Sequence, residues 1–283
     1  MLGVEAFDDA GAFFVAAEPV LSADPAGYTV IASVLADVRA AARSYPSARW
    51  FVVRDGETAV GAVMHTPPYA PYLGPMPEQA GMLVADAIAE SAGGTAADVA
   101  GFNGEIEVTR AAVTRWQERF GGPPVQATVS MRLYRLGALQ VPTVPGSART
   151  ATAVDWDVML DWHLTFADEI AHPVHEIETG LRARLERELL TVWEDGDRPV
   201  AMAGRTEPAA GVVRVGPVYT PPEHRRCGYG AAVTAAASTA ARAVPATLEV
   251  VLSTDLGNPT TNKIYAEIGY RPVRDYLEVS FSP

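Results

Sequence analysis

Apolar runs bounded by turn signals occur twice along the chain. Residues 49–64 form two apolar runs on either side of the pair Asp55-Gly56, and residues 190–203 repeat this arrangement around Asp195-Gly196. An Asp-Gly pair between two apolar runs is a strong short-range signal for a β-hairpin. The pattern therefore predicts two similar hairpins, one in each half of the chain.

Further features recur in the same order in both halves: a Gly-Pro pair, an apolar residue followed by glycine, and a closing strand. They are Leu73–Pro75 and Val215–Pro217, Phe120–Gly121 and Ile268–Gly269, and Ser130–Leu136 and Tyr276–Phe281. Together with the hairpins, these matches predict two copies of one α/β fold, against the alternative of one large domain. Pro142, Pro145 and Gly146 interrupt any regular element between the halves. We therefore expect domains at 1–142 and 149–283.

The hydrophobic period in the second half switches between helical and extended. Apolar residues at a spacing of four predict two helices, one beginning at Asp155 and one after Pro173. Their expected apolar faces are Val158, Trp162 and Phe166, and Ile177, Leu181, Leu185 and Leu189. Further strands are expected at 212–219, 247–253 and 276–281, and further helices at 228–242 and 259–268. A sheet with helical connections is an α/β fold.

The composition is that of a globular chain able to bury a sizeable core, since 48% of its 283 residues are hydrophobic and 20% are charged. The formal charge of −12 argues against nucleic acid as a partner, because phosphate binding needs a basic patch. An acidic chain favours a cationic ligand such as an amine, although solubility alone explains the charge more simply.

The sequence also bears on the cellular compartment. No apolar run approaches the roughly 18–20 residues that a membrane helix needs, so no membrane partner is expected. The N-terminus carries Glu5, Asp8 and Asp9 without an early Lys or Arg, which argues against a secretory signal. The single cysteine, Cys227, cannot form an intrachain disulfide. This favours the reducing cytoplasm.

Residues 218–230 carry the most specific chemical signal. A strand ends, two prolines break the chain, and a loop with Gly228 and Gly230 leads into an alanine-rich helix. A helix N-terminus offers unpaired N–H groups and a positive dipole end, and glycine lets the backbone approach a phosphate. Arg225 and Arg226 add positive charge, so we expect a pyrophosphate site. A P-loop or a dinucleotide site is disfavoured, because neither glycine motif occurs.

The spacing Arg225-x-x-Gly228-x-Gly230 resembles the pyrophosphate-binding motif of the GNAT superfamily of N-acetyltransferases. The pattern N-x-x-x-N-x-x-Y-x-x-x-G-Y at 258–270 resembles the second CoA-binding motif of that family. Both motifs occur in order, and the resemblance covers about residues 149–283. It implies two GNAT-like domains in tandem, each a mixed, mostly antiparallel twisted sheet flanked by helices. It also implies acetyl-CoA as the co-substrate and no metal.

The resemblance implies roles for individual residues in holding acetyl-CoA. The backbone of Val218, Tyr219 and Thr220 would pair with the pantetheine amides, and one N–H of this strand would polarise the thioester carbonyl. Asn258 and Asn262 would contact the CoA arm. The residues implied around the pyrophosphate are Arg225, Arg226, Cys227, Gly228, Tyr229, Gly230 and Ala231. A proline within the strand, at position 217, lacks an N–H, which fits a bulged or splayed strand.

By the same resemblance, Tyr265 would protonate the departing thiolate. A phenol of pKa ~10 and a thiol of pKa ~8.5 are close enough for such help. A packing role for this ring is the alternative. Cys227 invites comparison with a catalytic nucleophile, but no Cys/His geometry follows from the sequence and we interpret it as incidental. Asn258 also precedes Pro259 as a helix N-cap would.

A base for the acceptor amine is harder to place. An amine of pKa ~10.4 must lose a proton before it attacks, and in the GNAT family the region between the first two helices lines the acceptor pocket. Glu249, on the strand between the two motifs, is another candidate for this base. The sequence does not decide between Glu249 and the residues of that region. Acidic and histidine side chains crowd the first region without a metal-site spacing: His163, Asp168, Glu169, His172, His175, Glu176 and Glu178.

The first half departs from these motifs. The spacing between the two hairpins places Ala85–Glu90 opposite the glycine loop, where acidic residues replace glycine. Aligning Gly121 with Gly269 places Gln117 opposite Tyr265. We therefore expect a degenerate copy that is structural or shapes the acceptor pocket.

The function expected from these observations is transfer of an acetyl group from acetyl-CoA directly to an amine of a small molecule or peptide. Two alternatives remain open. One is a non-catalytic acyl-CoA-binding or sensing module, and the other is an acetyltransferase acting on a protein lysine or N-terminus. The same fold can also carry longer acyl groups.

Overall fold

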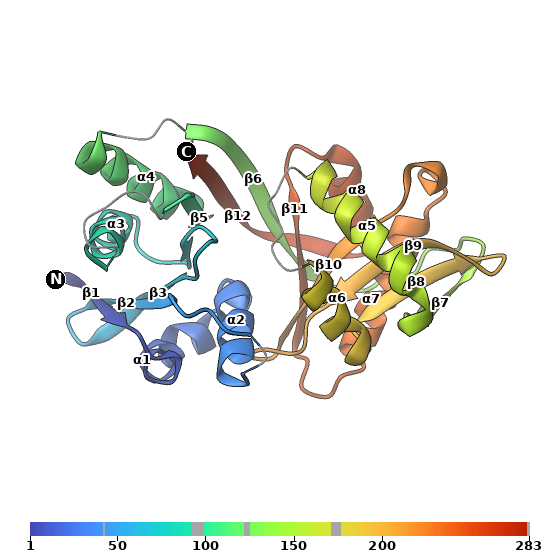
Figure 1. Ribbon diagram of the computed structural model, residues 1–283, viewed down its shortest axis with the longest axis horizontal. Helices are drawn as coiled ribbons and strands as arrows, with labels where there is room; N and C mark the ends of the chain where they lie inside the picture. The colour runs from blue at the N-terminus through green and yellow to red at the C-terminus, as the bar shows by residue number, and fades with distance from the viewer. Residues whose placement is uncertain (42, 92–98, 122–124, 171–176, 282–283) are drawn as a thin grey trace. The chain divides into compact units, whose positions relative to one another are not determined.

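A computed structural model describes residues 1–41, 43–91, 99–121, 125–170 and 177–281 (Figure 1). The chain folds as two compact units, which we call the first and second units. The first comprises Met1–Leu133, Thr254–Asn258 and Pro272–Pro283, and the second comprises Tyr134–Ser253 and Pro259–Arg271. The sequence predicted a single boundary between residues 142 and 149. The two units are not divided at one point, because the last strand of each half, at 125–136 and at 270–281, has residues in both units.

The first unit alternates strands with helices. Its elements are β1 (Leu2–Phe7), α1 (Ala10–Ala23), α2 (Thr29–Arg39), β2 (Arg49–Asp55), β3 (Thr58–His65), β4 (Tyr72–Leu73), α3 (Ala80–Ser91), β5 (Gly101–Glu105), α4 (Ile106–Phe120) and most of β6 (Val125–Leu136). The Asp55 hairpin is present as predicted, because β2 and β3 pair antiparallel and Asp55 lies opposite Thr58.

The second unit repeats this order. Its elements are β7 (Ser147–Thr150), the short η1 (Ala153–Asp155), α5 (Trp156–Glu169), α6 (Ile177–Glu186), β8 (Leu190–Asp195), β9 (Arg198–Arg205), β10 (Val212–Tyr219), the short η2 (Pro222–His224), α7 (Tyr229–Arg242), β11 (Glu249–Asp255), α8 (Pro259–Glu267) and the start of β12 (Tyr270–Phe281). The Asp195 hairpin is also confirmed, since β8 pairs antiparallel with β9.

The two units share one connectivity. In each, one strand is followed by two helices, three strands, a helix, a strand, a helix and a closing strand (Figure 1). The strands also lie in the same order, β1-β2-β3-β4-β5 in the first unit and β7-β8-β9-β10-β11 in the second. Pairing is mostly antiparallel, with parallel pairs at β4–β5 and β10–β11. The predicted pair of similar α/β domains is confirmed.

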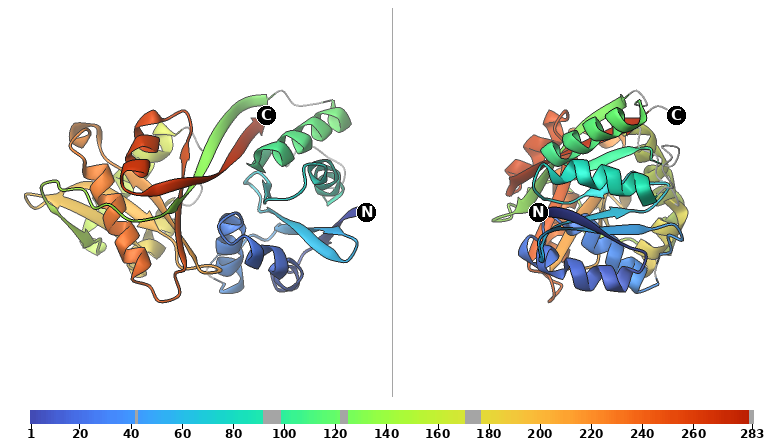
Figure 2. Two further views of the ribbon diagram at one scale, coloured as in Figure 1. Left: turned by 180° about the vertical axis from the view of Figure 1, so that it is seen from behind. Right: turned by 90° about the vertical axis from the view of Figure 1, so that its left-hand side faces the viewer.

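Each sheet has helices on both faces. In the second unit, one apolar cluster joins the sheet to α7 and α8, and another joins it to α5 and α6. Figure 1 shows α5 and α6 in front of this sheet, and the left view of Figure 2 shows it from behind, with α7 and α8. The first unit is built in the same way, with α1 and α2 on one cluster and α3 and α4 on the other.

Several sequence predictions need correction in detail. Val158 was expected on the apolar face of α5 but is 39% exposed, and the buried residue beside it is Met159. Because the helical period is 3.6 residues, a strict spacing of four rotates by about 40° at each step and so drifts off the buried face. Leu189 is buried as expected, although α6 ends at Glu186.

The closing strand β12 is longer than predicted and serves the first unit. Its residues Tyr276–Ser280 pair antiparallel with β5, residue for residue down to Gly101. Leu277, Val279 and Phe281 complete the apolar cluster under α3 and α4. The C-terminal strand of the second half is therefore part of the core of the first unit.

Candidate active site

The sheet of the second unit opens beside β10. The parallel pairing of β10 with β11 joins Val212–Arg214 to Glu249–Val251 and, in the described part of the chain, extends no further. On its other edge β10 pairs with β9, but the register shifts between Val215 and Val218. The intervening Pro217 has no N–H to donate. A bulge here confirms the expectation from the sequence, and no β10–β11 pair follows it among the described residues.

A glycine on β9 makes room for the bulge. A Cβ at Gly204 would lie 2.8 Å from the Gly216 carbonyl oxygen and 3.2 Å from Pro217 Cδ. Real Cβ contacts this close to backbone are essentially absent, so a side chain at this position must push β10 away. The bulge thus depends on a contact between two strands and not on β10 alone.

Gly204→Ala is therefore expected to displace the bulge and weaken CoA binding about tenfold or more, with a loss of stability of about 1–3 kcal/mol. Isothermal calorimetry and chemical denaturation measure the two effects. Gly3→Ala is the matched control, because it is also a strand glycine and its Cβ would meet nothing within 4 Å. Unchanged CoA affinity in Gly204→Ala would show that the bulge does not shape the site.

The glycine loop delivers the backbone of α7 to this opening. Arg226 and Gly228 both have left-handed backbone, with φ of 66° and 85°, and Gly228 is the N-cap of α7. The first helical bond runs from the Ala232 N–H to the Gly228 carbonyl at 3.1 Å. The N–H groups of Tyr229, Gly230 and Ala231 therefore point out of the helix end, where an anion is favoured.

Helix α7 is held by two tyrosines, Tyr229 at its first residue and Tyr270 at Ser238 in its second half. The Tyr229 hydroxyl donates to the Asp195 carboxylate in the β8–β9 turn at 2.5 Å, and this bond raises the pKa of Tyr229. The Tyr270 hydroxyl, from the second motif, lies 2.7 Å from Ser238 Oγ and is fully buried. The side chain of Tyr229 thus holds the helix in place, while its backbone N–H faces the loop.

The remaining loop residues differ in what they contact. Arg225 donates from Nη2 to Glu169 at 2.7 Å and from Nε to the Thr220 carbonyl at 2.9 Å. Arg226 is exposed, and no partner of its side chain occurs within the described ranges. Cys227 is also exposed, with Sγ 3.7 Å from the Arg225 carbonyl oxygen. No histidine contact of this thiol is seen among the described residues.

Tyr265 lies on α8 between two other aromatic rings. Its ring centroid is 6.5 Å from that of Tyr134 and 6.2 Å from that of Tyr270. The Tyr134 hydroxyl donates to Asn262 Oδ1 at 2.7 Å, which fixes the amide one turn before Tyr265. Burial, and next the nearby Tyr270, raise the pKa of the Tyr265 hydroxyl. The hydroxyl is therefore protonated at neutral pH, as a proton donor must be, but the raised pKa also makes it a weaker acid than an ordinary phenol.

Two other predicted residues lie elsewhere. Asn258 directly precedes α8, where the sequence suggested an N-cap, but by its contacts it belongs to the first unit, and its N–H donates to the Asp255 carbonyl at 3.1 Å. Glu249 pairs with Val212 at the closed end of the β10–β11 ladder, and its carboxylate lies 2.7 Å from Arg135 Nε. This position disfavours Glu249 as the base for an amine at the open end.

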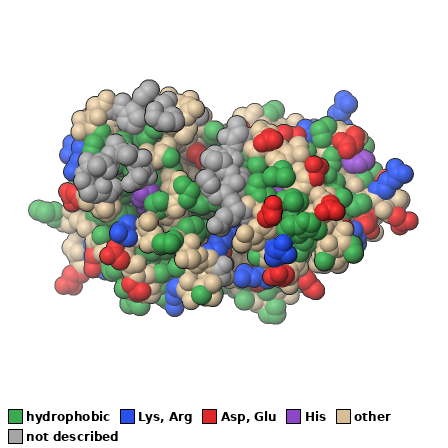
Figure 3. Space-filling model, viewed as in Figure 1, with side chains coloured by type: hydrophobic (Ala, Val, Ile, Leu, Met, Phe, Trp, Pro, Cys, Tyr) green, Lys and Arg blue, Asp and Glu red, His purple; other side chains and the backbone are tan. Residues whose placement is uncertain are grey.

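The helices on the opposite face meet β10 through Tyr219. Its ring lies 6.1 Å from that of Trp162 and 6.2 Å from that of Phe166, both on α5. The space-filling view shows hydrophobic and carboxylate side chains together over α5 and α6 (Figure 3). The exposed apolar side chains of α5 and its end include Val158, Leu164 and Ile170. Three of the crowded residues, His172, His175 and Glu176, lie outside the described residues.

His163 is buried on α5 as a neutral imidazole. Its Nδ1 donates to the Met159 carbonyl at 2.7 Å, and its Nε2 has no hydrogen-bond partner within the part of the chain that the structure describes. Burial lowers the pKa of His163 to about 4. Within the same part of the chain, no three metal-ligating side chains gather.

The burial of His163 predicts an acid-sensitive fold. Its pKa is lower in the folded state than the ~6.5 of an unfolded chain, so the unfolded state binds the proton first as pH falls. We expect about 3 kcal/mol of stability to be lost between pH 6.5 and pH 4 on this account. Denaturation of wild type and His163→Leu across this range tests it. A wild-type pH dependence no steeper than that of the variant would contradict the assignment.

The corresponding region of the first unit is closed. Both residues of β4 pair with β5, and a Cβ at Gly104 would lie 2.2 Å from the Leu73 carbonyl oxygen. Helix α3 begins at Ala80, so the segment that corresponds to the glycine loop is 75–79 rather than the expected Ala85–Glu90. That segment contains no glycine and carries one carboxylate.

Helix α3 is also packed directly against α4. A Cβ at Gly81 would lie 2.2 Å from the Val108 carbonyl oxygen. Asp86 of α3 binds Arg115 and Arg119 of α4 at 3.0 and 2.8 Å. The acidic residue noted in the sequence thus joins two helices.

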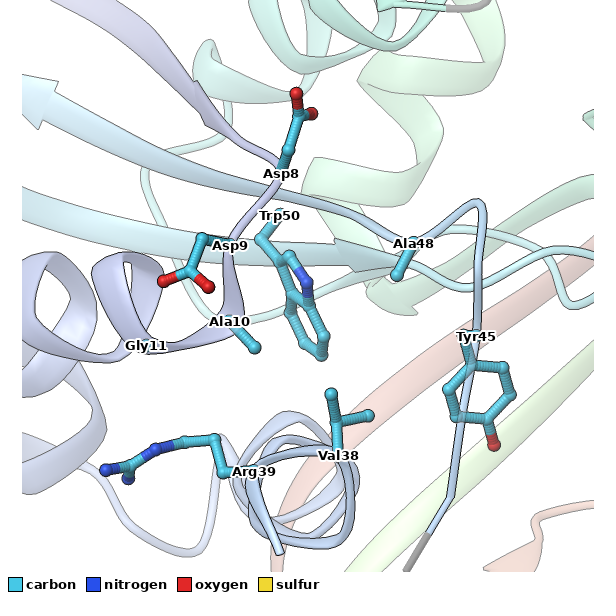
Figure 4. Close-up of a pocket in the computed structure, with 9 residues that line it drawn as sticks. All are labelled: Asp8, Asp9, Ala10, Gly11, Val38, Arg39, Tyr45, Ala48 and Trp50. Carbon is cyan, nitrogen blue, oxygen red and sulfur yellow. The ribbon is translucent and has the colours of Figure 1, made fainter. Parts of the chain in front are cut away.

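A cavity of about 470 Å³ lies in the first unit, beside α1, α2 and β2 (Figure 4). Its charged groups do not converge on one point. The Asp8 side chain points away from the Trp50 ring (Figure 4), and Asp8 Oδ1 lies 3.2 Å from Arg49 Nε. Asp9 caps α1 by accepting the N–H of Ala12. These groups already serve the local fold, so we assign no ligand to the cavity.

Comparison with known families agrees with this geometry. Residues 156–270 match the family described as acetyltransferase (GNAT) family, and this range contains the open strand pair, the glycine loop and α8. Over this range the chain is similar to the GNAT acetyltransferase family. The tandem arrangement of two GNAT-like folds then accounts for the whole chain.

Solved structures of GNAT proteins share this fold over 80–100% of the chain. An acetyltransferase of the GNAT family from Colwellia psychrerythraea shares 12% identity over 99% of both chains, with a TM-score of 0.58. A tandem GNAT protein from the clavulanic acid biosynthesis pathway shares 13% identity over 100% of this chain and 99% of its own, with a TM-score of 0.54. A GCN5-related N-acetyltransferase from Kribbella flavida shares 21% identity over 80% and 89%, with a TM-score of 0.55.

No curated protein matches this chain in sequence. Among the helices within the described ranges, none is both long and apolar enough to cross a membrane.

Sequence reasoning missed the residues that support this candidate site from a distance. Tyr134 comes from the first half of the chain, yet it packs in the second unit and binds Asn262. Asp195 was noted only as a turn residue, and Glu169 only as one of several acidic residues. An ion pair or hydrogen bond between distant positions leaves no local pattern, so no signal in a single sequence could have identified these three.

Proposed function

We propose that the second unit binds acetyl-CoA between the diverging ends of β10 and β11 and transfers its acetyl group directly to an amine. The observation that carries this proposal is the loss of strand pairing beyond Arg214, directly before a bulge at Pro217. Backbone groups of the strand end at Val218, Tyr219 and Thr220 would bind the pantetheine amides. The N–H groups at the start of α7 would bind the pyrophosphate.

The reaction needs no acyl-enzyme. The neutral amine nitrogen attacks the thioester carbonyl and forms a C–N bond, an N–H of β10 stabilises the developing oxyanion, and the C–S bond then breaks. The nitrogen loses one proton to solvent as the amide forms. The departing sulfur takes a proton from the Tyr265 hydroxyl, and the resulting tyrosinate recovers a proton from solvent. The acceptor would approach from the side of α5 and α6, where carboxylates and apolar side chains are exposed together. An amine of a small molecule or peptide fits such a surface.

The first unit is proposed to be a degenerate copy that binds no CoA. Its β4 is paired along both residues, and α3 and α4 are in direct contact at Gly81. These contacts take the space that an inserted cofactor arm would need.

The test combines calorimetry with a panel of amines. CoA titrated into the full chain is expected to bind at one site per chain. Acetyl-CoA is expected to release thiol only when a suitable amine is added, with acetylated amine as the second product. Two sites per chain would contradict the degenerate copy, and no binding would contradict the site itself. If CoA binds tightly but no amine or peptide in the panel causes acetyl-CoA to release thiol, the result would instead favour a CoA-binding module.

A further inference from the structure

Arg225 belongs to the glycine loop, but its guanidinium faces the end of α5. Nη2 contacts both carboxylate oxygens of Glu169, at 2.7 and 2.8 Å, and Nε donates to the Thr220 carbonyl at 2.9 Å. The Tyr219 hydroxyl lies 3.5 Å from the same carboxylate. The Arg225 guanidinium carbon is 5.8 Å from the centre of the Tyr219 ring. One cluster thus joins α5, the end of β10 and the loop.

Arg226 is in the opposite situation. Its backbone is left-handed, with φ of 66°, and its side chain is exposed. In the part of the chain that the structure describes, no carboxylate or carbonyl pairs with it. Among the described residues the two adjacent arginines therefore differ in their electrostatic state, because Glu169 neutralises the charge of Arg225 and no described carboxylate neutralises that of Arg226.

A guanidinium held on a carboxylate and a carbonyl is also fixed in direction. For Arg225 to reach a phosphate, it would have to leave Glu169 and Thr220, and a carboxylate beside the loop would then repel the same phosphate. Arg226 can approach an anion at the start of α7 without breaking any contact. The sequence motif alone assigns charge to both residues equally.

We propose that Glu169 is a positioning residue for the glycine loop, that it holds Arg225 away from the phosphates, and that Arg226 is the cation that contacts the pyrophosphate. This inference rests on the proposed function. The Glu169–Arg225 pair would order the loop before CoA arrives, which lowers the entropic cost of binding. The pair also connects the loop to α5, the helix on the acceptor side. Acetyl-CoA and the amine would then bind to elements that are held in fixed positions relative to each other.

The experiment measures calorimetric CoA affinity at two salt concentrations for five proteins: wild type, Glu169→Gln, Arg225→Gln, the double variant, and Arg226→Gln. The side chains of Glu169 and Arg225 are 39% and 43% exposed, and a pair of this exposure contributes little. We therefore expect each single variant to weaken CoA binding about fivefold and the double variant to weaken it no further. The salt dependence of Arg225→Gln and of the double variant should equal that of wild type, because Arg225 makes no phosphate contact in the wild-type protein.

Arg226→Gln is expected to weaken CoA binding about tenfold and to flatten the salt dependence, because a screened charge–charge contact is lost. Thermal denaturation checks that every variant is folded. The inference is overturned if Arg225→Gln flattens the salt dependence, if Glu169→Gln leaves CoA affinity unchanged, or if the losses in the double variant add. A wild-type chain that binds no CoA would instead overturn the proposed function.

Discussion

Replacement of Tyr265 by phenylalanine is expected to lower kcat by about 10²- to 10⁴-fold, the range that a positioned general acid contributes. The substitution removes one hydroxyl and little volume, and the ring contacts with Tyr134 and Tyr270 remain. Folding, CoA affinity and the KM for acetyl-CoA should therefore barely change. Steady-state kinetics with the best amine of the panel, under conditions where chemistry limits turnover, measures the effect.

Two controls sharpen the test of Tyr265. The loss should shrink with a thioester whose thiol is more acidic, because its thiolate needs less help from an acid. Burial raises the pKa of Tyr265 above its ordinary value of 10, so a decline of kcat that reports its deprotonation should appear only above pH 10. If Tyr265→Phe turns over at nearly the wild-type rate, the ring is a packing residue and another group delivers the proton.

Gly230→Glu is expected to weaken CoA binding by at least about 100-fold without unfolding the protein. The Cβ would have room, since its nearest neighbour is Thr220 Oγ1 at 3.4 Å. A carboxylate at the first turn of α7 would itself bind the helix end and stabilise it. The same carboxylate would stand close to the pyrophosphate, and two like charges about 4 Å apart repel by several kcal/mol near a protein surface. Calorimetry with CoA measures the loss.

Matched variants separate charge from size at this position. Gly230→Gln has the same shape without charge and should bind CoA far better than Gly230→Glu, while Gly230→Ala should bind nearly as wild type does. Gly228 is less suitable for this charge test, because its backbone is left-handed and a Cβ there would lie 2.8 Å from Val144 Cγ1. Any substitution at Gly228 disturbs the loop itself. Equal affinities of Gly230→Glu and Gly230→Gln would place the phosphates elsewhere.

Much of the second unit could be predicted from local sequence. The strand at 212–219 and the helix that begins after Gly228 have the predicted bounds, because strand ends, glycine and an alanine-rich run are local signals. The bulge was foreseen from Pro217, whose missing N–H is a property of the residue itself. The duplication was visible because Asp-Gly hairpins mark the same place in both halves.

The supporting contacts could not be predicted in this way. Glu169 and Arg225 are 56 positions apart in the chain, and the Tyr134–Asn262 bond spans 128 positions. Pairing at such distances depends on which elements pack together, and single sequences carry no record of it. The same reason explains why β12 was expected to close its own domain, when its residues pair with β5 in the first unit.

The sequence by itself determined the repeated α/β pattern, the glycine loop at the start of α7 and the two motifs around it, because periodicity, turns and glycine conformation act over a few residues. Only the tertiary structure decided that β10 and β11 separate after Arg214, that β4 and β5 stay paired, and that Arg225 binds Glu169 while Arg226 stays exposed. These outcomes depend on steric fit and charge pairing between distant segments, which exist only once the chain has folded.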